Sequence, residues 1–507
     1  MIREVPAISG FALAAALAAA LAAAPGTAAA ALVSQGAFRI GADAYWSRGL
    51  TGSGETVAVL DLGFAGLDAS IAAGELPPRE RLVLRSFDAE FGLDGRSAVG
   101  ARTEHGVRMA EIVHDLAPAA TLVLVNYHTQ GEFEQAVEWL VANEIPIVSH
   151  SNSFLTSPHD GTGRAARAVD RAAAAGVLWV NSAGNYAQRH WSGRLGPTPT
   201  VLPLSPRPGE VLQFAAGWTG APAAQVELAV ERRAAGGEWS AAARSGPDPE
   251  AQPRVDGAAS ALTPPVAADT GEWRLVARAV TGGEVAAEIF SRSVTFGSHG
   301  VAASSVMTPG DAAGALTVGA VPWTGSELAP YSSQGPTDDG RLKPDLVAPT
   351  YVTSNPDWPG TAGTSAAAPH VAAAAALLRQ ARRQNGRPAG PAELREDLRR
   401  GALDLGPPGA DPLFGAGLAR LDTSPPRVRV RIGRGLRPVL YIRVSDDGTV
   451  GTVRVRYRGR EIAVRTGPRP SVRLPALRRG RNRVEVLASD LAGNVGRLAR
   501  TVIRGTR

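Results

Sequence analysis

Short apolar segments alternate with helix-like segments over two stretches of this chain, residues 41–187 and residues 302–421. The apolar segments include TVAVLDLGF, TLVLVNY, IPIVSHSNS and VLWVNSAGN, and helix-like segments such as GEFEQAVEWLVAN stand between them. Strands that alternate with helices of about 10 to 15 residues are typical of βαβ units and of a mostly parallel sheet. The sequence therefore predicts an α/β fold in which two separate stretches of chain contribute to one sheet.

A different pattern fills the segment between these stretches, residues 191–299. This segment is rich in Pro and Gly, and its apolar residues recur with period two in AQVELAVERR, EWRLVARAV and AEIFSRSVTF. Short strands at regular spacing predict a small β-sandwich inserted into the α/β domain. The alternative is a long disordered surface loop, which the recurrence of strand-like segments disfavours.

A third unit follows the linker-like sequence Ser424-Pro425-Pro426. Valine and isoleucine alternate with arginine in RVRVRI, and the pattern returns in TVRVRYRGR, as expected of strands with one buried face. The unit resembles the bacterial immunoglobulin-like repeats of secreted proteins. The predicted organisation is a signal peptide at 1–30, an α/β domain at 41–190 and 300–423, an inserted β-sandwich at 191–299, and a basic immunoglobulin-like β domain at 427–507.

The first residues have the pattern of a secretory signal peptide. Arg3 gives a basic start, a 14-residue apolar run (FALAAALAAALAAA) follows, and small residues lead to a predicted cleavage site near Ala28 to Ala31. The alternative, a membrane-spanning helix, needs about 20 apolar residues. We therefore expect an extracellular protein with no transmembrane segment. The chain contains no cysteine, which excludes disulfides and thiol chemistry.

Positive charge is concentrated in the last unit. Residues 427–507 contain 21 Arg and no Lys against 5 Asp and Glu, so this unit carries about +16, whereas the chain as a whole carries +6. One interpretation is a tail that binds an anionic polymer at the cell surface. The alternative is that arginine only covers the solvent face of each strand. Specific nucleic-acid recognition is not expected, because neither an RNA-binding aromatic motif nor a helix-turn-helix pattern is present.

Ser365 stands in GTSAAAPHV, directly before an Ala-rich segment. A serine at the start of a helix is either an ordinary N-cap or a nucleophile whose oxyanion the helix N-terminus stabilises. A nucleophilic serine needs a base and a group that orients the base. His105, in TEHGVRMAEIV, and Asp61, at the end of the strand TVAVLD, are the candidates for these roles.

These residues and their surroundings resemble the subtilases, the subtilisin-like serine peptidases. The resemblance rests on VAVLDLG around Asp61, EHG around His105, NSAGN ending at Asn185, YSSQGPTDDGRLKPDLVAP at 331–349 and GTSAAAPHVA around Ser365. It implies that Asp61 orients His105, that His105 is the general base and then acid, that Ser365 forms the acyl-enzyme, and that Asn185 belongs to the oxyanion hole. It also implies substrate contacts for Ser151, Asn152, Ser153, Gly184 and Gly363.

The chain departs from the family pattern at several positions. Leu62 replaces the usual Thr or Ser after the aspartate, and Gly-Val follows the histidine where Gly-Thr is usual, so Val107 replaces the Thr. Ser153 replaces the glycine of the Ser-Leu-Gly strand that pairs with substrate, so it narrows the space beside an entering peptide. We also expect no N-terminal prodomain, because only about 30 residues separate the predicted cleavage site from Asp61.

No metal site or cofactor is expected from the sequence. The remaining histidines, including His159 and His190, lack metal-like spacing, and no loop of alternating acidic residues typical of calcium sites is present, although a structural calcium ion occurs often in the family. The predicted function is a secreted serine endopeptidase acting on proteins or peptides. The alternatives are a catalytically silent subtilase scaffold that binds or adheres outside the cell, and an esterase that uses the same triad.

Overall fold

The computed structural model describes residues 32–507 except 98–99, 157, 220–223, 248–258, 422–423, 447–449, 491–493 and 505–507. The predicted signal peptide therefore lies outside the described residues. Within them, no helix has both the length and the apolar character needed to cross a membrane.

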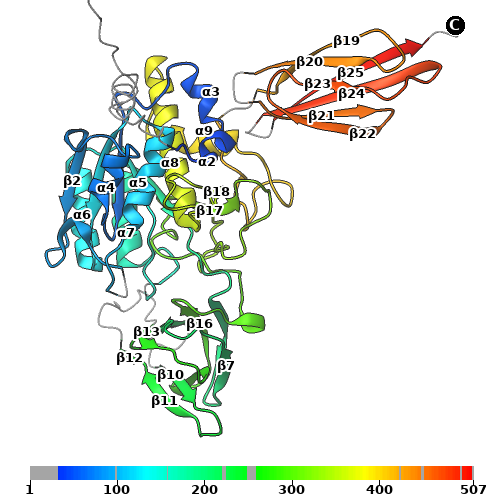
Figure 1. Cartoon of the computed structure of the whole chain (residues 1–507). Helices are drawn as coiled ribbons and strands as arrows, with labels where there is room; N and C mark the ends of the chain where they lie inside the picture. The colour runs from blue at the N-terminus through cyan, green and yellow to red at the C-terminus, as the bar shows by residue number, and fades with distance from the viewer. Residues whose placement is uncertain are drawn as a thin grey trace, which may run out of the picture. The chain divides into compact units, whose positions relative to one another are not determined.

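A seven-stranded sheet, parallel at every pairing, forms the centre of the α/β part (Figure 1). Its spatial order is β18-β17-β5-β4-β1-β3-β2, so strands that follow the long insertion extend the edge started by strands that precede it. This confirms the predicted fold class. The strands are β1 (Thr56–Asp61), β2 (Leu82–Ser86), β3 (Thr121–Asn126), β4 (Ile147–His150), β5 (Leu178–Ser182), β17 (Ala315–Pro322) and β18 (Leu346–Thr350).

Helices cover both faces of this sheet because its strands are apolar on both sides. In β1, Val57 and Val59 pack into a core shared with α5 and α8, whereas Ala58 and Leu60 pack into a second core shared with α6 and α7. Parallel strands buried on both faces require such a three-layer arrangement. The helices are α2 (Gln35–Ile40), α3 (Ala42–Trp46), α4 (Leu67–Ala73), α5 (His105–Leu116), α6 (Gln130–Ala142), α7 (Arg164–Ala174), α8 (Thr364–Gln384) and α9 (Pro391–Gly401).

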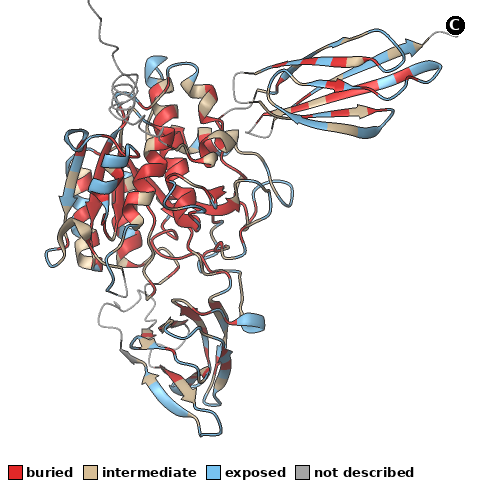
Figure 2. Cartoon of the chain, viewed as in Figure 1, coloured by how far each residue is buried: buried red, intermediate tan, exposed pale blue. Residues whose placement is uncertain are grey.

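Helix α8 is buried along most of its length, as Figure 2 shows. The segments Ala366–Ala368 and Ala372–Ala376 are fully buried. Because alanine side chains are small, the helix backbone can approach the sheet closely at these positions. The amino-terminal end of α8 is thereby fixed against the sheet, which positions Ser365.

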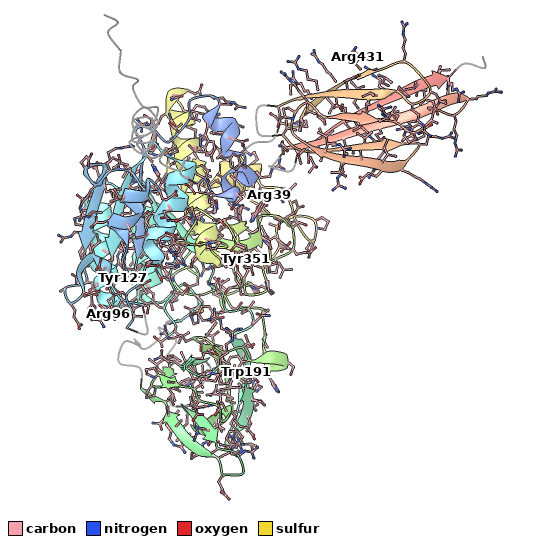
Figure 3. The ribbon with its side chains drawn as sticks, viewed as in Figure 1. Arg39, Arg96, Tyr127, Trp191, Tyr351 and Arg431 are labelled. Carbon is pink, nitrogen blue, oxygen red and sulfur yellow. The ribbon has the colours of Figure 1, made fainter. Side chains whose placement is uncertain are left out.

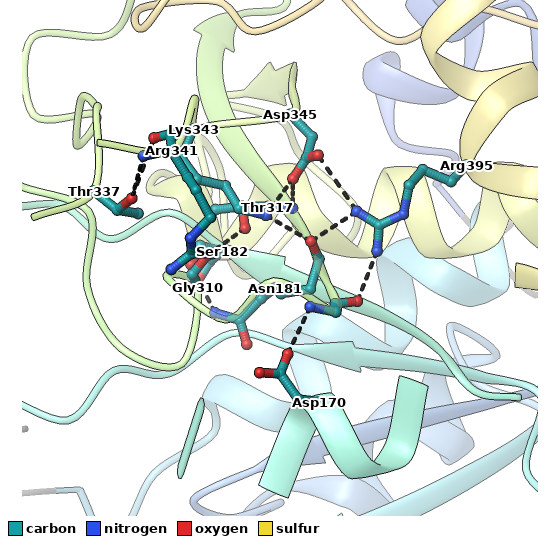
Figure 4. Close-up of polar contacts among 12 residues, drawn as sticks. Asp170, Asn181, Ser182, Gly310, Thr317, Thr337, Arg341, Lys343, Asp345 and Arg395 are labelled. Atoms are coloured by element: carbon teal, nitrogen blue, oxygen red, sulfur yellow. Dashed lines mark hydrogen bonds and ion pairs between the residues drawn. The ribbon is translucent and has the colours of Figure 1, made fainter. Parts of the chain in front are cut away.

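A buried polar network holds the segment that leads into β18 (Figure 4). The Lys343 ammonium donates to Asp345 Oδ2 and to the carbonyl of Ala315, both at 2.6 Å. Arg395 on α9 donates to the same carbonyl at 2.9 Å, and Thr317 N donates to Asp345 Oδ2 at 2.8 Å. The charges of Lys343 and Arg395 outweigh the effect of burial and lower the pKa of Asp345. The network thus joins α9, β17 and β18.

The insertion forms two main antiparallel sheets that share one apolar core, as predicted for an inserted β-sandwich. The core includes Phe214, Trp218 and Trp273, and Trp191, labelled in Figure 3, packs against it. The strands are β6 (His190–Leu195), β7 (Thr200–Leu204), β8 (Val211–Leu212), β9 (Phe214–Thr219), β10 (Gln225–Arg233), β11 (Ser240–Arg244), β12 (Gly246–Pro247), β13 (Ala259–Leu262), β14 (Val266–Ala267), β15 (Glu272–Thr281) and β16 (Val285–Ser291).

The C-terminal unit is also all antiparallel, with the sheets β19-β20-β23 and β22-β21-β24-β25. Alternation follows the sequence: in β19 every arginine is exposed and every apolar residue is partly buried. The Arg431 guanidinium lies 4.7 Å from the centre of the Tyr441 ring. Its likeness to an immunoglobulin-like domain stays a prediction. The strands are β19 (Arg427–Ile432), β20 (Val439–Ser445), β21 (Val450–Tyr457), β22 (Arg460–Thr466), β23 (Ser471–Arg473), β24 (Gly480–Asp490) and β25 (Val495–Arg504).

Candidate active site

Asp61 and His105 form a hydrogen-bonded pair at the carboxyl end of β1 and the start of α5. His105 Nδ1 lies 2.8 Å from Asp61 Oδ2 and 3.0 Å from Oδ1, and the Leu62 N–H also donates to Oδ1 at 2.8 Å. A carboxylate only accepts, so Nδ1 carries the proton in this pair. Nε2 of the neutral ring is then the basic nitrogen, which is the tautomer that a general base requires.

The surroundings of His105 favour its protonation. Burial alone would lower the pKa of His105, but the charge of Asp61 and its hydrogen bond outweigh burial, and the pKa is raised. The Asp61 side chain is fully buried, whereas the His105 side chain is 34% exposed. The imidazole can therefore reach a bound molecule while its orienting partner stays shielded from water.

Gly106 allows α5 to begin beside the turn that follows β1. A Cβ atom at Gly106 would lie 2.6 Å from the Gly63 carbonyl oxygen and 2.7 Å from the Phe64 ring. Instead, the Gly106 N–H donates to that carbonyl at 3.1 Å. This close contact holds the start of α5, which carries His105, against the turn that follows Asp61. A larger residue at position 106 would push the two segments apart.

Ser365 is the second residue of α8. Gly363, with φ of +110°, directly precedes the helix. Its hydroxyl donates to the Ser151 carbonyl at 3.0 Å, and the Ser151 hydroxyl donates to the Ser365 carbonyl at 3.1 Å. Among the described residues, Ser365 has no hydrogen bond to His105. The structure thus brings the start of α8 against the end of β4, and the Ser365 hydroxyl is turned toward that strand.

Asn185 lies against the same turn. Its Oδ1 accepts from Thr364 N at 2.9 Å and from Thr364 Oγ1 at 3.1 Å, and the Thr364 hydroxyl also lies 3.1 Å from Gly184 N. Because Oδ1 is held by these donors, the amide nitrogen is left for another acceptor. A Cβ placed on Gly363 would lie 3.2 Å from Asn185 Nδ2, so this amide stands directly beside the glycine that precedes α8.

The five predicted substrate contacts lie around this turn. Ser151 touches Ser365, as described, and Asn152 has a buried amide nitrogen with no partner among the described residues. Ser153 follows as a partly buried residue. Gly184 has φ of +103°, and a Cβ there would meet Met307 at 2.8 Å. With Gly363 these residues belong to the segments after β4 and β5 and before α8.

His150, which the sequence does not distinguish from the other histidines, joins a buried series of hydrogen bonds behind the site. His150 Nδ1 bonds Asn181 Oδ1 at 2.7 Å, and His150 Nε2 bonds the hydroxyl of Tyr127, labelled in Figure 3, at 2.8 Å. Burial lowers the pKa of His150 to about 4, and it raises the pKa of Tyr127 well above its usual range. Both groups are therefore neutral, and His150 Nε2 accepts a hydrogen bond from the Tyr127 hydroxyl. No local sequence signal marks these hydrogen bonds, because Tyr127, His150 and Asn181 belong to three separate segments of the sequence.

His370 also has a fixed structural role. Its Nε2 lies 2.9 Å from Ser34 Oγ and its Nδ1 bonds the Ala366 carbonyl at 2.7 Å. Gly36 passes so close that a Cβ there would lie 2.0 Å from His370 Nε2. The histidine after the serine motif therefore anchors the amino-terminal segment to α8.

The chain order Asp61, His105, Ser365, carried on one parallel sheet, is that of subtilisin-like proteins. The Subtilase family model matches residues 246–417, a segment that contains Ser365. Pyrolysin of Pyrococcus furiosus is 33% identical over 161 residues, which cover 25% of this chain and 11% of pyrolysin. The chain thus spans about a ninth of that relative's length. These matches confirm the resemblance to the subtilase family.

A solved structure supports the same fold. The CspB protease of Clostridium perfringens is similar with a TM-score of 0.54 and 19% identity, and the match covers 75% of this chain and 96% of that chain. At this identity the similarity concerns the fold. It agrees with the α/β architecture described above.

Proposed function

We propose that the protein is a serine endopeptidase of the subtilisin type that hydrolyses peptide bonds in proteins or peptides. The observation that carries the proposal is the Asp61–His105 pair, with the histidine proton on Nδ1, together with the start of α8, where Ser365 follows the residue that bonds Asn185. The family match over the Ser365 segment supports it.

The reaction would begin with rotation of the Ser365 hydroxyl away from the Ser151 carbonyl. Ser365 Oγ then attacks the substrate carbonyl carbon while His105 Nε2 takes its proton. The resulting oxyanion is stabilised by Asn185 Nδ2 and the Ser365 N–H at the α8 terminus. His105 next gives the proton to the leaving amine, and the acyl-enzyme forms. Water, deprotonated by His105, then releases the acid and restores Ser365.

Secretion and cell-surface attachment are further parts of this proposal. The amino-terminal sequence supports export, and the 21 arginines of residues 427–507 support attraction to an anionic surface polymer. Substrates would then be extracellular proteins or peptides.

The test is covalent labelling by a fluorophosphonate, which reacts with activated serine hydroxyls. We expect the mature protein to be labelled and the Ser365→Ala variant to be unlabelled. Ser326→Ala removes an exposed serine outside the site and should label as the parent does. A folded parent that resists labelling would contradict the proposal and favour a silent scaffold. Parallel casein and short-ester assays distinguish a peptidase from an esterase.

A further inference from the structure

A second cluster of ionisable side chains lies outside the candidate active site, where the insertion meets the loop after β4. One ligand atom from each of His159, Glu288 and Asp338 lies within 4.8 Å of the other two. His190 adjoins this set, since its Nε2 lies 3.7 Å from Glu288 Oε2. From these residues we propose a site for a divalent transition-metal ion, Zn²⁺, that joins the inserted β-sandwich to the α/β part.

The first argument is the orientation of His190. Its Nδ1 lies 2.8 Å from the Val301 carbonyl, which only accepts, so Nδ1 carries the proton. Nε2 then has its lone pair, is fully buried, and has no hydrogen-bond partner among the described residues. A lone pair that faces a carboxylate across 3.7 Å is unfavourable unless a proton or a metal cation lies between them. A backbone carbonyl behind the other ring nitrogen is also the usual support of a metal-ligating histidine.

The second argument is the spacing of the ligand atoms. Zn²⁺ binds imidazole nitrogen and carboxylate oxygen at about 2.0 to 2.2 Å, so tetrahedral ligand atoms stand about 3.4 Å apart. The His159 Nδ1 to Glu288 Oε1 distance is 3.1 Å, and the His190 Nε2 to Glu288 Oε2 distance is 3.7 Å. Small side-chain rotations would therefore bring the set to coordination distance.

The third argument is charge. The carboxylates of Glu288, Asp338 and Asp311 all lie close enough to the buried ring of His159 to interact with it electrostatically. Asp311 also has a buried oxygen without a partner among the described residues, although Gly161 N donates to its other oxygen at 2.8 Å. Arg341 contributes positive charge nearby. Three acidic groups around two imidazoles make a field that attracts a cation.

The proposed site lies beside a cavity, and packing and hydrogen bonds hold its ligands in place. A cavity of about 420 Å³ is lined in part by His190, Glu288 and Asp338. The rings of His159 and His190 each lie 4.5 Å from the Phe290 ring, and Asp338 N donates to the His159 carbonyl at 3.3 Å. An ion held here would link β6 and β16 of the insertion to the loop that begins at Ser151. The nitrogen ligands favour Zn²⁺ over Ca²⁺, which takes six to eight oxygen ligands.

The sequence did not indicate this site, because Glu288 stands 129 residues from His159. Histidine spacing and acidic-loop patterns, on which the expectation of no metal depends, detect only ligands that lie close together in the sequence. A proton shared between these imidazoles and Glu288 is the competing explanation for the cluster. It predicts the same hydrogen bond but no metal uptake.

The experiment measures Zn²⁺ binding by calorimetry to the full chain carrying Ser365→Ala, after dialysis against a chelator, with Ca²⁺ as comparison. We expect one Zn²⁺ per chain and no comparable Ca²⁺ binding. Glu288→Gln and His159→Gln should each weaken Zn²⁺ binding by about 10-fold or more. His299→Gln, which removes an exposed histidine outside the cluster, should bind as the parent does.

X-ray absorption of the zinc-loaded parent gives a result that does not depend on the variants folding. Two imidazoles in the first coordination shell are expected. Zn²⁺ binding no tighter than Ca²⁺ binding, equal binding by folded Glu288→Gln, or a shell without imidazole would overturn the proposal. Because binding is measured without catalysis, the result is independent of whether the protein is a peptidase.

Discussion

Ser365 and Ser151 exchange two hydrogen bonds: each hydroxyl donates to the other residue's carbonyl, at 3.0 and 3.1 Å. Pro369, inside α8, explains one of them. Proline has no N–H, so the helical donor that would normally reach the Ser365 carbonyl four residues earlier is missing. The Ser151 hydroxyl satisfies this carbonyl instead. The pair joins the start of α8 to the end of β4 and holds the proposed nucleophile in a resting orientation.

Asp61→Asn should remove most of the activity without unfolding the protein. An amide can donate to His105 Nδ1 and so favour the wrong tautomer, with the proton on Nε2. In serine peptidases with this arrangement, the change lowers kcat by about 10⁴. The measurement is kcat on a peptide substrate, with circular dichroism to verify the fold. A variant that keeps more than a tenth of the parent's kcat would contradict the role given to Asp61.

Asn185→Ala should lower kcat by about 10² to 10³ with little change in KM, because an oxyanion-hole donor acts mainly in the transition state. Thr364→Val provides the matched control. It removes one of the two donors that hold Asn185 Oδ1, so it should cost much less activity. Equal losses in both variants would mean that Asn185 supports the turn rather than the oxyanion.

Gly36→Ala should destabilise the protein by displacing His370. The new Cβ would stand 2.0 Å from His370 Nε2, in a region where the histidine is fully buried. Gly131→Ala in α6 is the control, since a Cβ there meets nothing within 4 Å. Alanine at Gly131 should leave the melting temperature unchanged or raise it. Thermal denaturation in the Ser365→Ala background, which prevents self-digestion, measures both; a Gly36→Ala protein as stable as the parent would contradict the packing described.

Glu111 should make stability fall as pH rises. This fully buried carboxyl accepts from Ser70 Oγ at 2.7 Å and from Asn355 Nδ2 at 3.0 Å, and burial raises its pKa from 4.5 to about 7. The folded state then binds more protons than the unfolded state between pH 4.5 and 7. The free energy of unfolding therefore decreases across this interval, by up to about 1.4 kcal/mol per pH unit from this group.

The test compares the parent with Glu111→Gln, which keeps the shape and removes the titration. Urea denaturation at several pH values, with Ser365→Ala in both proteins, gives the two free energies of unfolding. We expect the difference to favour the glutamine variant increasingly from pH 4.5 to 7. A difference that is constant with pH would show that Glu111 does not titrate in this range.

Much of the fold was predictable because it depends on local patterns. A continuous apolar segment such as residues 56–60 predicts a strand that is buried on both faces. The alternation RVRVRI predicts a strand that is buried on one face. Asp61, His105 and Ser365 also lie where a strand ends or a helix begins, but their proposed roles come from the resemblance of their motifs to the subtilases. These positions are encoded within a few residues of sequence.

Other features depend on which segments meet in space. The Ser151–Ser365 pair joins residues 214 apart, the His150–Asn181 bond joins adjacent strands, and the cluster of His159, His190 and Glu288 forms only where the insertion folds back. Local sequence sets the preference of each residue for a strand, a turn or a helix end. Hydrogen-bond partners, burial and the resulting pKa shifts depend on distances of a few ångströms between such segments, and only tertiary packing determines those distances.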